Sequence, residues 1–301
     1  MLSILIPTYN YNVYPLVEEL KKQADALQIM YEILVQDDHS TLFLKENSEI
    51  NTLVNCYYTL NTKNLGRGNN INALQLKAKF EYVLILEADA LPKDGNYLAN
   101  FIKNIFPTTE VIFGGVVYPE TKPQPNQLLR WKYGCKRESI ALQTRLKKPF
   151  HFVFTWNLLL KKEILNQNPF PNSVREYGYE DVVFLKKLKE KKVHIQHIDN
   201  PLIHYNQESN LVFINKTETA IRTLKQLMEN KELDSDDTRI GKTFFLLKQL
   251  GFDTILRFLF LKFHNRILSN LTSTNPSLLL LDLYKLGYLC NLDNPLQSKK
   301  K

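Results

Sequence analysis

Three short polar clusters follow apolar runs in the first ninety residues of the chain, at residues 7–10 (PTYN), 36–40 (QDDHS) and 87–89 (EAD). A carboxylate inside a buried strand is destabilising unless it is paired, hydrogen-bonded or bound to a cation. At the end of a strand that penalty falls, and the carboxylate can bind a ligand. Asp38 could accept a hydrogen bond from a nucleobase N–H, and Asp89 could hold a hard divalent cation that bridges two phosphates.

The elements that must position these clusters alternate between strand and helix. We predict strands at 2–7, 31–38, 54–58 and 81–86, with amphipathic helices at 15–27 and around 71–78. Short apolar strands separated by such helices favour right-handed crossovers and a mostly parallel sheet flanked by helices, an α/β fold. Ligands of these sheets bind beyond the carboxyl ends of the strands. All three polar clusters fall at those ends, which predicts one site.

The pattern becomes mixed beyond residue 110. We predict a strand at 111–118, loop and short helix at 119–150, and a return to the sheet at 151–157. A loop leads into a helix within 177–192, two short strands flank a turn within 193–206, and a helix covers 216–229. From about residue 240 the chain is strongly apolar and basic. We therefore predict a domain of residues 1–230 followed by a helical C-terminal appendage of residues 231–301.

Composition and charge narrow the possible partners. The 301 residues are 44% hydrophobic and 23% charged, which is typical of a globular protein. The net charge of +8 admits nucleic acid, an anionic membrane surface or an acidic substrate such as a nucleotide. Five lysines between residues 186 and 192 fit the solvated face of one helix, and no nucleic-acid-binding motif accompanies the charge. We expect no nucleic-acid partner.

The cysteines and the apolar runs bear on compartment. Cys56, Cys135 and Cys290 have no metal-ligand spacing, so we expect ordinary buried thiols in a reducing compartment and no zinc site. The apolar stretch before Pro7 is shorter than the apolar region of a signal peptide, and no run of eighteen apolar residues occurs. These features favour a cytoplasmic protein. Such a protein could also attach peripherally to the inner face of the plasma membrane.

Two common nucleotide-binding motifs are excluded. The chain has no GxxxxGK[ST] loop, and its GRG at residues 66–68 lacks the third glycine of a dinucleotide-binding fingerprint. A kinase or a dehydrogenase is therefore disfavoured.

Six sequence stretches, taken together in their order and spacing, match the motifs of one enzyme family. They are SILIPTYN, ILVQDDHST, NLGRGNNIN, YVLILEADALP, GYGYEDVVFLKKL and HIDNPLIH. Over residues 1 to about 230 the chain resembles the family 2 glycosyltransferases. The resemblance implies a GT-A type nucleotide-binding fold. It also implies an inverting transfer from a nucleotide-diphosphate sugar, usually UDP-linked, that depends on Mn or Mg.

The resemblance also implies roles for individual residues. The nucleotide- and donor-binding positions are Pro7, Thr8, Tyr9, Asp38, Asn64, Gly66, Arg67, Glu87 and Ala88. Glu87 and Asp89 match the family's Asp-x-Asp, with Asp89 as the metal ligand, and His204 matches a position that in some members helps to hold the metal or the diphosphate. Asp181 matches the catalytic base. There are two departures: Glu87 is one methylene longer than the family's Asp, and Ile71 stands where many relatives carry Arg.

Several of these residues also have a purely structural explanation. Glu180 and Asp181 suit the start of a helix, where the unpaired N–H groups and the helix dipole favour carboxylates. His204 lies in an apolar stretch and could be an ordinary buried histidine. Trp156 and Glu180 are candidate acceptor-binding residues. Trp156 could stack on an acceptor sugar, or it could fill the core.

We therefore predict a metal-dependent glycosyltransferase that transfers a sugar to a hydroxyl of a glycan or lipid-linked acceptor, in surface polysaccharide or lipopolysaccharide synthesis. One alternative is a non-catalytic basic protein that binds membrane or nucleic acid. Another is a nucleotidyltransferase, although that would need a glycine-rich basic loop directly after the first strand. Residues 243–268 and 277–289 are apolar with interspersed cations. They could pack as a helical appendage or lie in an anionic membrane interface.

Overall fold

A computed structural model describes residues 1–293, and its chain divides into two compact units. Unit 1 comprises residues 1–120, 134–175 and 184–206, and unit 2 comprises residues 121–133, 176–183 and the chain from 207 onward. The division differs from the boundary expected near residue 230. The helix that we predicted at 216–229 lies with the C-terminal helices, and two earlier segments join it there.

Unit 1 is built on a seven-stranded sheet of order β3-β2-β1-β4-β8-β6-β9. Its strands are β1 (Leu2–Thr8), β2 (Tyr31–Asp37), β3 (Cys56–Leu60), β4 (Tyr82–Ile85), β6 (Val111–Phe113), β8 (Leu158–Lys161) and β9 (Ile195–His197). Strand β8 runs antiparallel to β4 and β6, while the other pairings are parallel. The predicted mostly parallel α/β sheet is confirmed.

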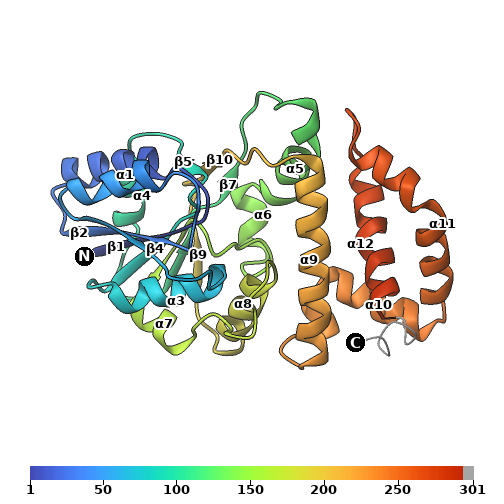
Figure 1. The fold of residues 1–301 in the computed structure, drawn as a ribbon. Coiled ribbons are helices and arrows are strands. Elements are labelled where there is room, and N and C mark those ends of the chain that lie inside the picture. Colours follow the sequence, from blue (N-terminus) through green and yellow to red (C-terminus); the bar gives the residue numbers. More distant parts are fainter. Residues whose placement is uncertain (294–301) are drawn as a thin grey trace. The chain divides into compact units, whose positions relative to one another are not determined.

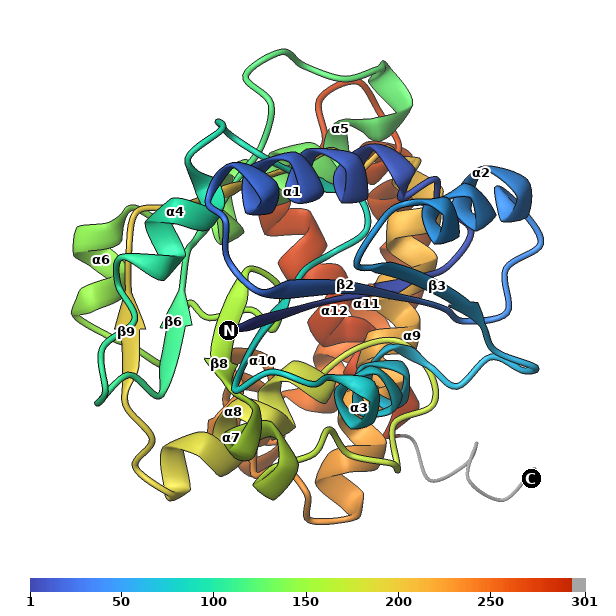
Figure 2. The same cartoon turned by 90° about the vertical axis from the view of Figure 1, so that its left-hand side faces the viewer.

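Helices cover both faces of this sheet. Helices α1 (Tyr14–Ala26) and α4 (Tyr97–Ile102) lie on one face, and α3 (Arg67–Lys77) and α7 (Lys162–Gln167) lie on the other (Figures 1 and 2). Shorter helical segments are α2 (Leu44–Ser48), η1 (Glu49–Thr52), the π-helical η3 (Gly134–Glu138) and α6 (Leu142–Leu146). The crossovers therefore place successive parallel strands in register with their carboxyl ends at one edge.

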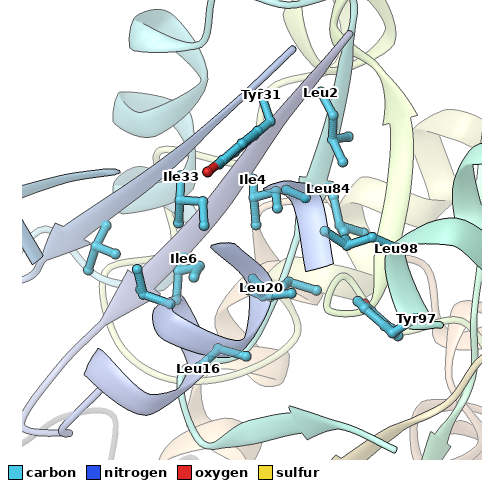
Figure 3. Packing of buried hydrophobic residues seen from close by; sticks show 14 of the residues in the cluster. Leu2, Ile4, Ile6, Leu16, Leu20, Tyr31, Ile33, Leu84, Tyr97 and Leu98 are labelled. Carbon is cyan, nitrogen blue, oxygen red and sulfur yellow. The ribbon is translucent and has the colours of Figure 1, made fainter. Parts of the chain in front are cut away.

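The core beneath α1 follows from two periodicities. Leu2, Ile4 and Ile6 of β1 point to the same face because side chains alternate along a strand, and Leu16 and Leu20 of α1 are one helical turn apart. These five side chains are at most 1% exposed and pack together (Figure 3). Burying each such aliphatic side chain contributes about 1.5–3 kcal/mol. This packing fixes the strand that ends at the first polar cluster.

A smaller three-stranded sheet, of order β5-β10-β7, lies beyond the ends of the main one. It contains β5 (Ala90–Pro92), β7 (Val116–Val117) and β10 (Leu202–His204). The strand predicted at 111–118 is therefore two strands, because the chain turns at Gly114 and Gly115. Gly115 has φ +92°, and a Cβ on Gly114 would lie 2.5 Å from the Asn157 side chain.

The prediction of a strand at 151–157 is wrong, since the strand begins at Leu158. Asn157 has φ +60°, a left-handed conformation that a strand does not accommodate. Its side chain donates to the carbonyls of Gly115 (2.6 Å) and Asn200 (2.9 Å) and accepts from the Tyr97 hydroxyl (2.6 Å). Side-chain hydrogen bonds thus replace a sheet ladder in this buried segment.

Unit 2 is helical. Its elements are η2 (Pro125–Gln127), α5 (Leu128–Tyr133), α9 (Asn210–Glu229), η4 (Ser235–Asp237), α10 (Arg239–Gln249), α11 (Asp253–Leu271) and α12 (Leu278–Leu292). Helix α12 packs between α9 and α11 (Figure 1), around a core that includes Phe213, Phe260, Leu281 and Tyr284. Helix α9 begins at Asn210, six residues earlier than we predicted, with Ser209 as its N-cap. Within residues 1–293, every helix is too short or too polar to cross a membrane.

Helix α8 (Glu180–Glu190) begins in unit 2 and continues in unit 1. Leu185 and Leu188 are buried, as predicted. Of the five lysines predicted to form one solvated helix face, Lys189, Lys191 and Lys192 are exposed and Lys186 and Lys187 are half-buried, and the helix ends at Glu190 before the last two. None of the three cysteines forms a disulfide within residues 1–293; Cys56 and Cys290 are buried and Cys135 is half-buried. Burial raises the pKa of Cys56 to about 11 and that of Cys290 to about 12.

Candidate active site

The carboxyl ends of β1, β2 and β4 bring the three polar clusters to one edge of the sheet. Strand β1 lies between the other two, and Asp38 N–H donates to the Thr8 carbonyl at 2.8 Å. Pro7 and Thr8 are buried, whereas the Tyr9 side chain, just past the strand, is 57% exposed. Tyr9 therefore offers an open aromatic ring at the edge where the sequence analysis expects a nucleobase.

Asp38 organises the loop that leads into α3. Its carboxylate accepts from the N–H of Leu65 (2.7 Å), the N–H of Gly66 (2.9 Å) and the amide of Asn61 (2.9 Å). The Asn64 side chain donates in turn to the Asp38 carbonyl (3.0 Å). Both carboxylate oxygens are thus bonded to the loop, so Asp38 has a positioning role in addition to the nucleobase contact that the resemblance implies.

Gly66 is required by the backbone of this loop. It has φ +81°, and a Cβ at this position would lie 2.7 Å from the Arg175 carbonyl oxygen. A residue with a side chain would be strained there on both counts. The glycine delivers Arg67 to the first turn of α3.

Arg67 and Glu87 form an ion pair across this edge. Glu87 Oε2 accepts from Arg67 Nε at 3.2 Å and from Nη2 at 3.1 Å, while Nη1 donates to Thr155 Oγ1 at 2.9 Å. The two side chains are 18% and 28% exposed. Sequence reasoning assigned both residues to donor binding but missed both their pairing and the contribution of Thr155. Ala88, between the two carboxylates, is buried.

Asp89 and His204 are joined by the second sheet. His204 on β10 pairs with Ala90 on β5, and the Tyr205 N–H donates to the Asp89 carbonyl at 2.8 Å. This register places His204 Nε2 2.9 Å from Asp89 Oδ1. The structure therefore brings together the two residues proposed from sequence as metal ligands. Burial and, to a lesser extent, the negative charge of Asp89 also raise the pKa of Tyr11.

His204 is enclosed by two aromatic rings and a further hydrogen bond. Its ring centroid lies 4.8 Å from that of Trp156 and 5.3 Å from that of Tyr118. The Tyr118 hydroxyl is 2.9 Å from His204 Nδ1 and donates to Glu138. Trp156 is 7% exposed and its ring also lies 5.9 Å from that of Phe154, so it packs in the interior, and sugar stacking remains a prediction. Sequence reasoning missed Tyr118 and Glu138.

Asp89 and His204 are the candidate ligands of the divalent cation that the resemblance implies. Within residues 1–293 no three His, Cys, Asp or Glu side chains cluster as a metal site. Asp89 and His204 do meet, and their 2.9 Å separation is close to the roughly 3 Å between neighbouring ligands of an octahedral cation with bonds of about 2.1 Å. Cations bound with substrate phosphates commonly take only one or two protein ligands. The residues present therefore fit such an ion.

Glu180 and Asp181 lie in unit 2, at the start of α8. Glu180 is buried and accepts a hydrogen bond from the N–H of Gly178, two residues earlier, at 3.1 Å. Asp181 is half-buried in the first turn of the helix. The residues before them have left-handed backbone, with φ +108° at Gly178 and φ +66° at Tyr179. Such conformations cost about 1–3 kcal/mol for a residue with a side chain and cluster at functional sites.

The loop that ends at Asp181 is held by α9. A Cβ on Gly178 would lie 2.6 Å from the Cβ of Ala220, and the Thr223 hydroxyl donates to the Tyr177 carbonyl at 3.2 Å. Lys216 Nζ lies 5.3 Å from the centre of the Tyr177 ring. Close backbone packing therefore fixes the position of the carboxylate that the sequence analysis assigns as the base.

The family model described as Glycosyl transferase family 2 matches residues 3–168, more than half of the chain. The chain belongs to glycosyl transferase family 2. The match covers the polar clusters of β1, β2 and β4 and the loop of Arg67, which confirms the resemblance. The roles of the individual site residues remain predictions, and Asp181 and His204 lie beyond the matched residues. No curated protein matches the chain.

Solved structures show that this family 2 chain has a GT-A fold. Residues 1–349 of S. aureus TarS, in complex with UDP-GlcNAc, match with TM-score 0.51 and 17% identity, over 95% of this chain and 90% of that one. The mannosyltransferase PcManGT from Pyrobaculum calidifontis, in complex with GDP-Man and Mn2+, matches with TM-score 0.51 and 19% identity, over 76% and 64%. Mannosyl-3-phosphoglycerate synthase from Rubrobacter xylanophilus gives 0.53 and 15%, over 78% and 76%.

The family 2 chain is shorter than some of these proteins. It spans 43% of a longer S. aureus TarS chain, which it matches with TM-score 0.50 and 19% identity, and 64% of PcManGT. At these identities the likeness establishes the fold, and the substrates of the neighbours remain statements about the neighbours.

Proposed function

We propose that the chain is an inverting, metal-dependent glycosyltransferase that uses a UDP-linked sugar and a hydroxyl of a glycan or lipid-linked acceptor, in surface polysaccharide or lipopolysaccharide synthesis. The observation that carries the proposal is the Asp89–His204 pair, 2.9 Å apart at the sheet edge where the Arg67–Glu87 pair and the Asp38 loop also lie. That combination offers a cation site beside polar groups suited to a nucleotide. TarS in complex with UDP-GlcNAc is the reason for choosing UDP.

The end of β1 supports a donor site. Thr8 Oγ1 is buried and has no hydrogen-bond partner among residues 1–293. An unsatisfied buried hydroxyl costs about 1–3 kcal/mol, which a polar ligand at this edge would recover. With Tyr9 exposed beside it and Asn64, Gly66 and Arg67 on the adjacent loop, a uridine and its phosphates are the proposed occupants.

The proposed reaction is a single displacement. Asp181 takes the proton of the acceptor hydroxyl as that oxygen attacks the anomeric carbon from the face opposite the diphosphate. The bond from the anomeric carbon to the diphosphate oxygen breaks in the same step, so the configuration inverts without a covalent sugar intermediate. Asp89 and His204 would hold the divalent cation. When bound, that ion would supply Lewis-acid stabilisation of charge on the leaving nucleoside diphosphate.

The test is an assay of the released product. The protein is incubated with a panel of UDP- and GDP-sugars and Mn2+ or Mg2+, and nucleoside diphosphate release is measured with and without candidate acceptors. We expect UDP release from one donor, and its loss in Asp89→Ala but not in Asp94→Asn, an exposed acid in the next loop. Pyrophosphate release from a nucleoside triphosphate and a sugar phosphate would instead indicate a nucleotidyltransferase.

We also propose that unit 2 lies against an anionic membrane through α10 and α11. The buried side of α11, with Phe260 and Leu271, packs in the core that contains Tyr284 of α12. The other side is also apolar, since Ile255, Phe258 and Leu259 are 54%, 61% and 41% exposed. This second apolar side is larger than single scattered surface residues would explain.

Cations border this exposed apolar face. Lys262 and Arg266 follow Phe258 and Leu259 at helical spacing, and Lys262 Nζ lies 5.9 Å from the centre of the Phe258 ring. Residues 239–271 contain six Lys or Arg and one acid. On α10 and the loop after it, further exposed apolar residues are Phe245, Leu246, Leu250 and Phe252. An apolar face with a basic border favours anionic lipid as its partner.

Co-sedimentation with vesicles tests this partner. We expect binding to phosphatidylglycerol-containing vesicles at low salt, and much weaker binding to phosphatidylcholine alone. Lys262→Gln/Arg266→Gln should weaken binding roughly 10- to 30-fold, at about 1 kcal/mol per basic residue. The control Lys45→Gln/Lys189→Gln removes two exposed cations of unit 1 and should bind normally. No vesicle binding, with concentration-dependent self-association instead, would assign the face to a second copy of the chain.

A further inference from the structure

We infer that Tyr118 and Glu138 are positioning residues that hold His204 in the tautomer and orientation needed to bind a cation together with Asp89. The inference rests on the proposed function, because it takes Asp89 and His204 as the metal ligands. Neither Tyr118 nor Glu138 belongs to a motif of the sequence analysis. Tyr118 contacts Nδ1 of the His204 ring, whereas Asp89 contacts Nε2, and Glu138 contacts the Tyr118 hydroxyl.

The direction of each hydrogen bond follows from donor chemistry. An ionised carboxylate only accepts, so the hydroxyl proton of Tyr118 is directed to Glu138. The Tyr118 oxygen is then an acceptor for His204 Nδ1, 2.9 Å away, which must carry the ring proton. In a neutral imidazole the other nitrogen is unprotonated. The Nε2 lone pair of His204 is therefore directed at Asp89.

Two acceptors facing one another require a positive charge between them. His204 Nε2 and Asp89 Oδ1 are 2.9 Å apart, a distance at which a lone pair and a carboxylate oxygen repel. A proton or a metal cation relieves that repulsion. Because the hydrogen bonds from Glu138 through Tyr118 favour the Nδ1–H tautomer, they favour a divalent cation as the group that joins His204 to Asp89.

The packing around Tyr118 is specific to this arrangement. The π-helical segment η3 contacts Tyr118 at both of its ends, through Gly134 and Glu138. A Cβ on Gly134 would lie 2.1 Å from Cζ of the Tyr118 ring, so only glycine allows the ring to lie there. Single π-helical turns occur frequently at functional sites. The Trp156 ring, 4.8 Å from His204 between centroids, limits rotation of the imidazole.

The first test measures metal binding. Tyr118→Phe keeps the ring and removes the hydroxyl, and loss of such a partner commonly weakens metal affinity about 10- to 100-fold. Mn2+ binding in the presence of UDP is followed by titration of the free-Mn2+ EPR signal, so that no turnover is needed. We expect that loss in Tyr118→Phe, and a smaller loss in Glu138→Gln, whose amide can still accept from Tyr118.

Tyr58→Phe is the matched control. Tyr58 also donates its hydroxyl to a buried carboxylate, that of Asp37 at 2.8 Å, within the same unit. It should bind Mn2+ as the wild type does, although it also loses a tyrosine–carboxylate hydrogen bond. A general effect of such a loss on stability would appear in both variants, whereas an effect through His204 would appear only in Tyr118→Phe.

The second test reads the tautomer without metal. The 15N chemical shifts of the His204 ring, assigned with His204→Gln, are recorded at mildly alkaline pH on metal-free protein. We expect the Nδ1–H form in the wild type and the Nε2–H form in Tyr118→Phe. An Nε2–H wild type, or unchanged Mn2+ affinity in both Tyr118→Phe and Glu138→Gln, would overturn the inference. A wild type with the Nδ1–H form that binds no Mn2+ with UDP would instead contradict the metal site of the proposed function.

Discussion

Glu87 Oε2 lies 3.1 Å from Arg67 Nη2, so the first carboxylate of the Glu-Ala-Asp cluster is paired with the guanidinium at the start of α3. The glutamate departs from the family's aspartate by one methylene, and in this chain the longer side chain makes this contact with both Nε and Nη2 of Arg67. The pair connects the end of β4 to the loop that Asp38 organises.

Glu87→Gln should therefore destabilise the protein while keeping the shape of the side chain. The substitution leaves the partly buried Arg67 cation facing a neutral amide. Hydrogen bonds to charged groups contribute about 1.5–3 kcal/mol to stability. The contribution of this pair is smaller because solvent reaches both side chains and screens their charges. We expect a loss of about 1 kcal/mol in urea unfolding. The control Glu81→Gln, exposed just before β4, should be neutral. Equal midpoints for wild type and Glu87→Gln would show that the pair does not contribute to stability.

Asp181→Asn should separate chemistry from donor binding. The amide cannot accept the acceptor's proton, and removal of a positioned general base lowers turnover by roughly 100- to 10,000-fold. UDP affinity, measured by calorimetry with Mn2+, should stay within about threefold, because the residue does not contact the donor in the proposed reaction. A transfer rate near that of the wild type would remove Asp181 from the role of base.

Gly178→Ala should lower turnover through the position of the same loop. The new Cβ would meet Ala220 Cβ at 2.6 Å, and φ +108° is unfavourable for alanine by about 1–3 kcal/mol. The double variant Gly178→Ala/Ala220→Gly removes the Cβ–Cβ contact but leaves the Cα of residue 220 at 2.9 Å and the backbone strain, so it should recover activity only in part. Gly95→Ala, where a Cβ has no neighbour within 4 Å, is the control. Full recovery in the double variant would assign the whole effect to the Cβ–Cβ contact.

The parts of this fold that sequence predicts are those governed by local periodicity. The apolar run that ends at Pro7 and the helical spacing of Leu16 and Leu20 are read directly from neighbouring residues, and parallel topology then places Asp38 and Asp89 at one edge. The failed strand at 151–157 has equally apolar residues. It is prevented by Asn157, whose hydrogen bonds reach residues more than forty positions away.

The site residues that sequence analysis missed also depend on contacts between residues that are far apart in sequence. Tyr118 contacts His204 across 86 positions of sequence and Arg67 contacts Thr155 across 88, and no local pattern specifies either pair. Tyrosine at the end of an apolar run is ordinary, and Glu138 has no apolar neighbours that mark it. Contacts of this kind depend on where β7, β10 and η3 meet, which only the tertiary structure determines.

His197 should make the protein less stable in mild acid. Its Nδ1 accepts from Arg145 at 3.1 Å, and its Nε2 faces the Pro149 carbonyl at 2.9 Å. Burial lowers its pKa from 6.5, as do the charges of Arg145 and His194 to a lesser extent, although the Pro149 carbonyl acts in the opposite direction. The folded state therefore binds this proton less readily than the unfolded chain.

The sign of the effect follows from that difference. Below about pH 6.5 the unfolded chain binds more protons at this residue, so the free energy of unfolding falls as the pH drops and stops falling below the folded pKa. Urea unfolding between about pH 7 and about pH 5, above the ordinary carboxylate range, isolates histidine effects. We expect His197→Gln to have a flatter profile than the wild type, and the control His39→Gln, an exposed histidine that is not among the groups shifting the pKa of His197, to keep the wild-type slope. Parallel profiles for wild type and His197→Gln would mean that His197 accepts a proton in the folded protein as readily as in the unfolded chain.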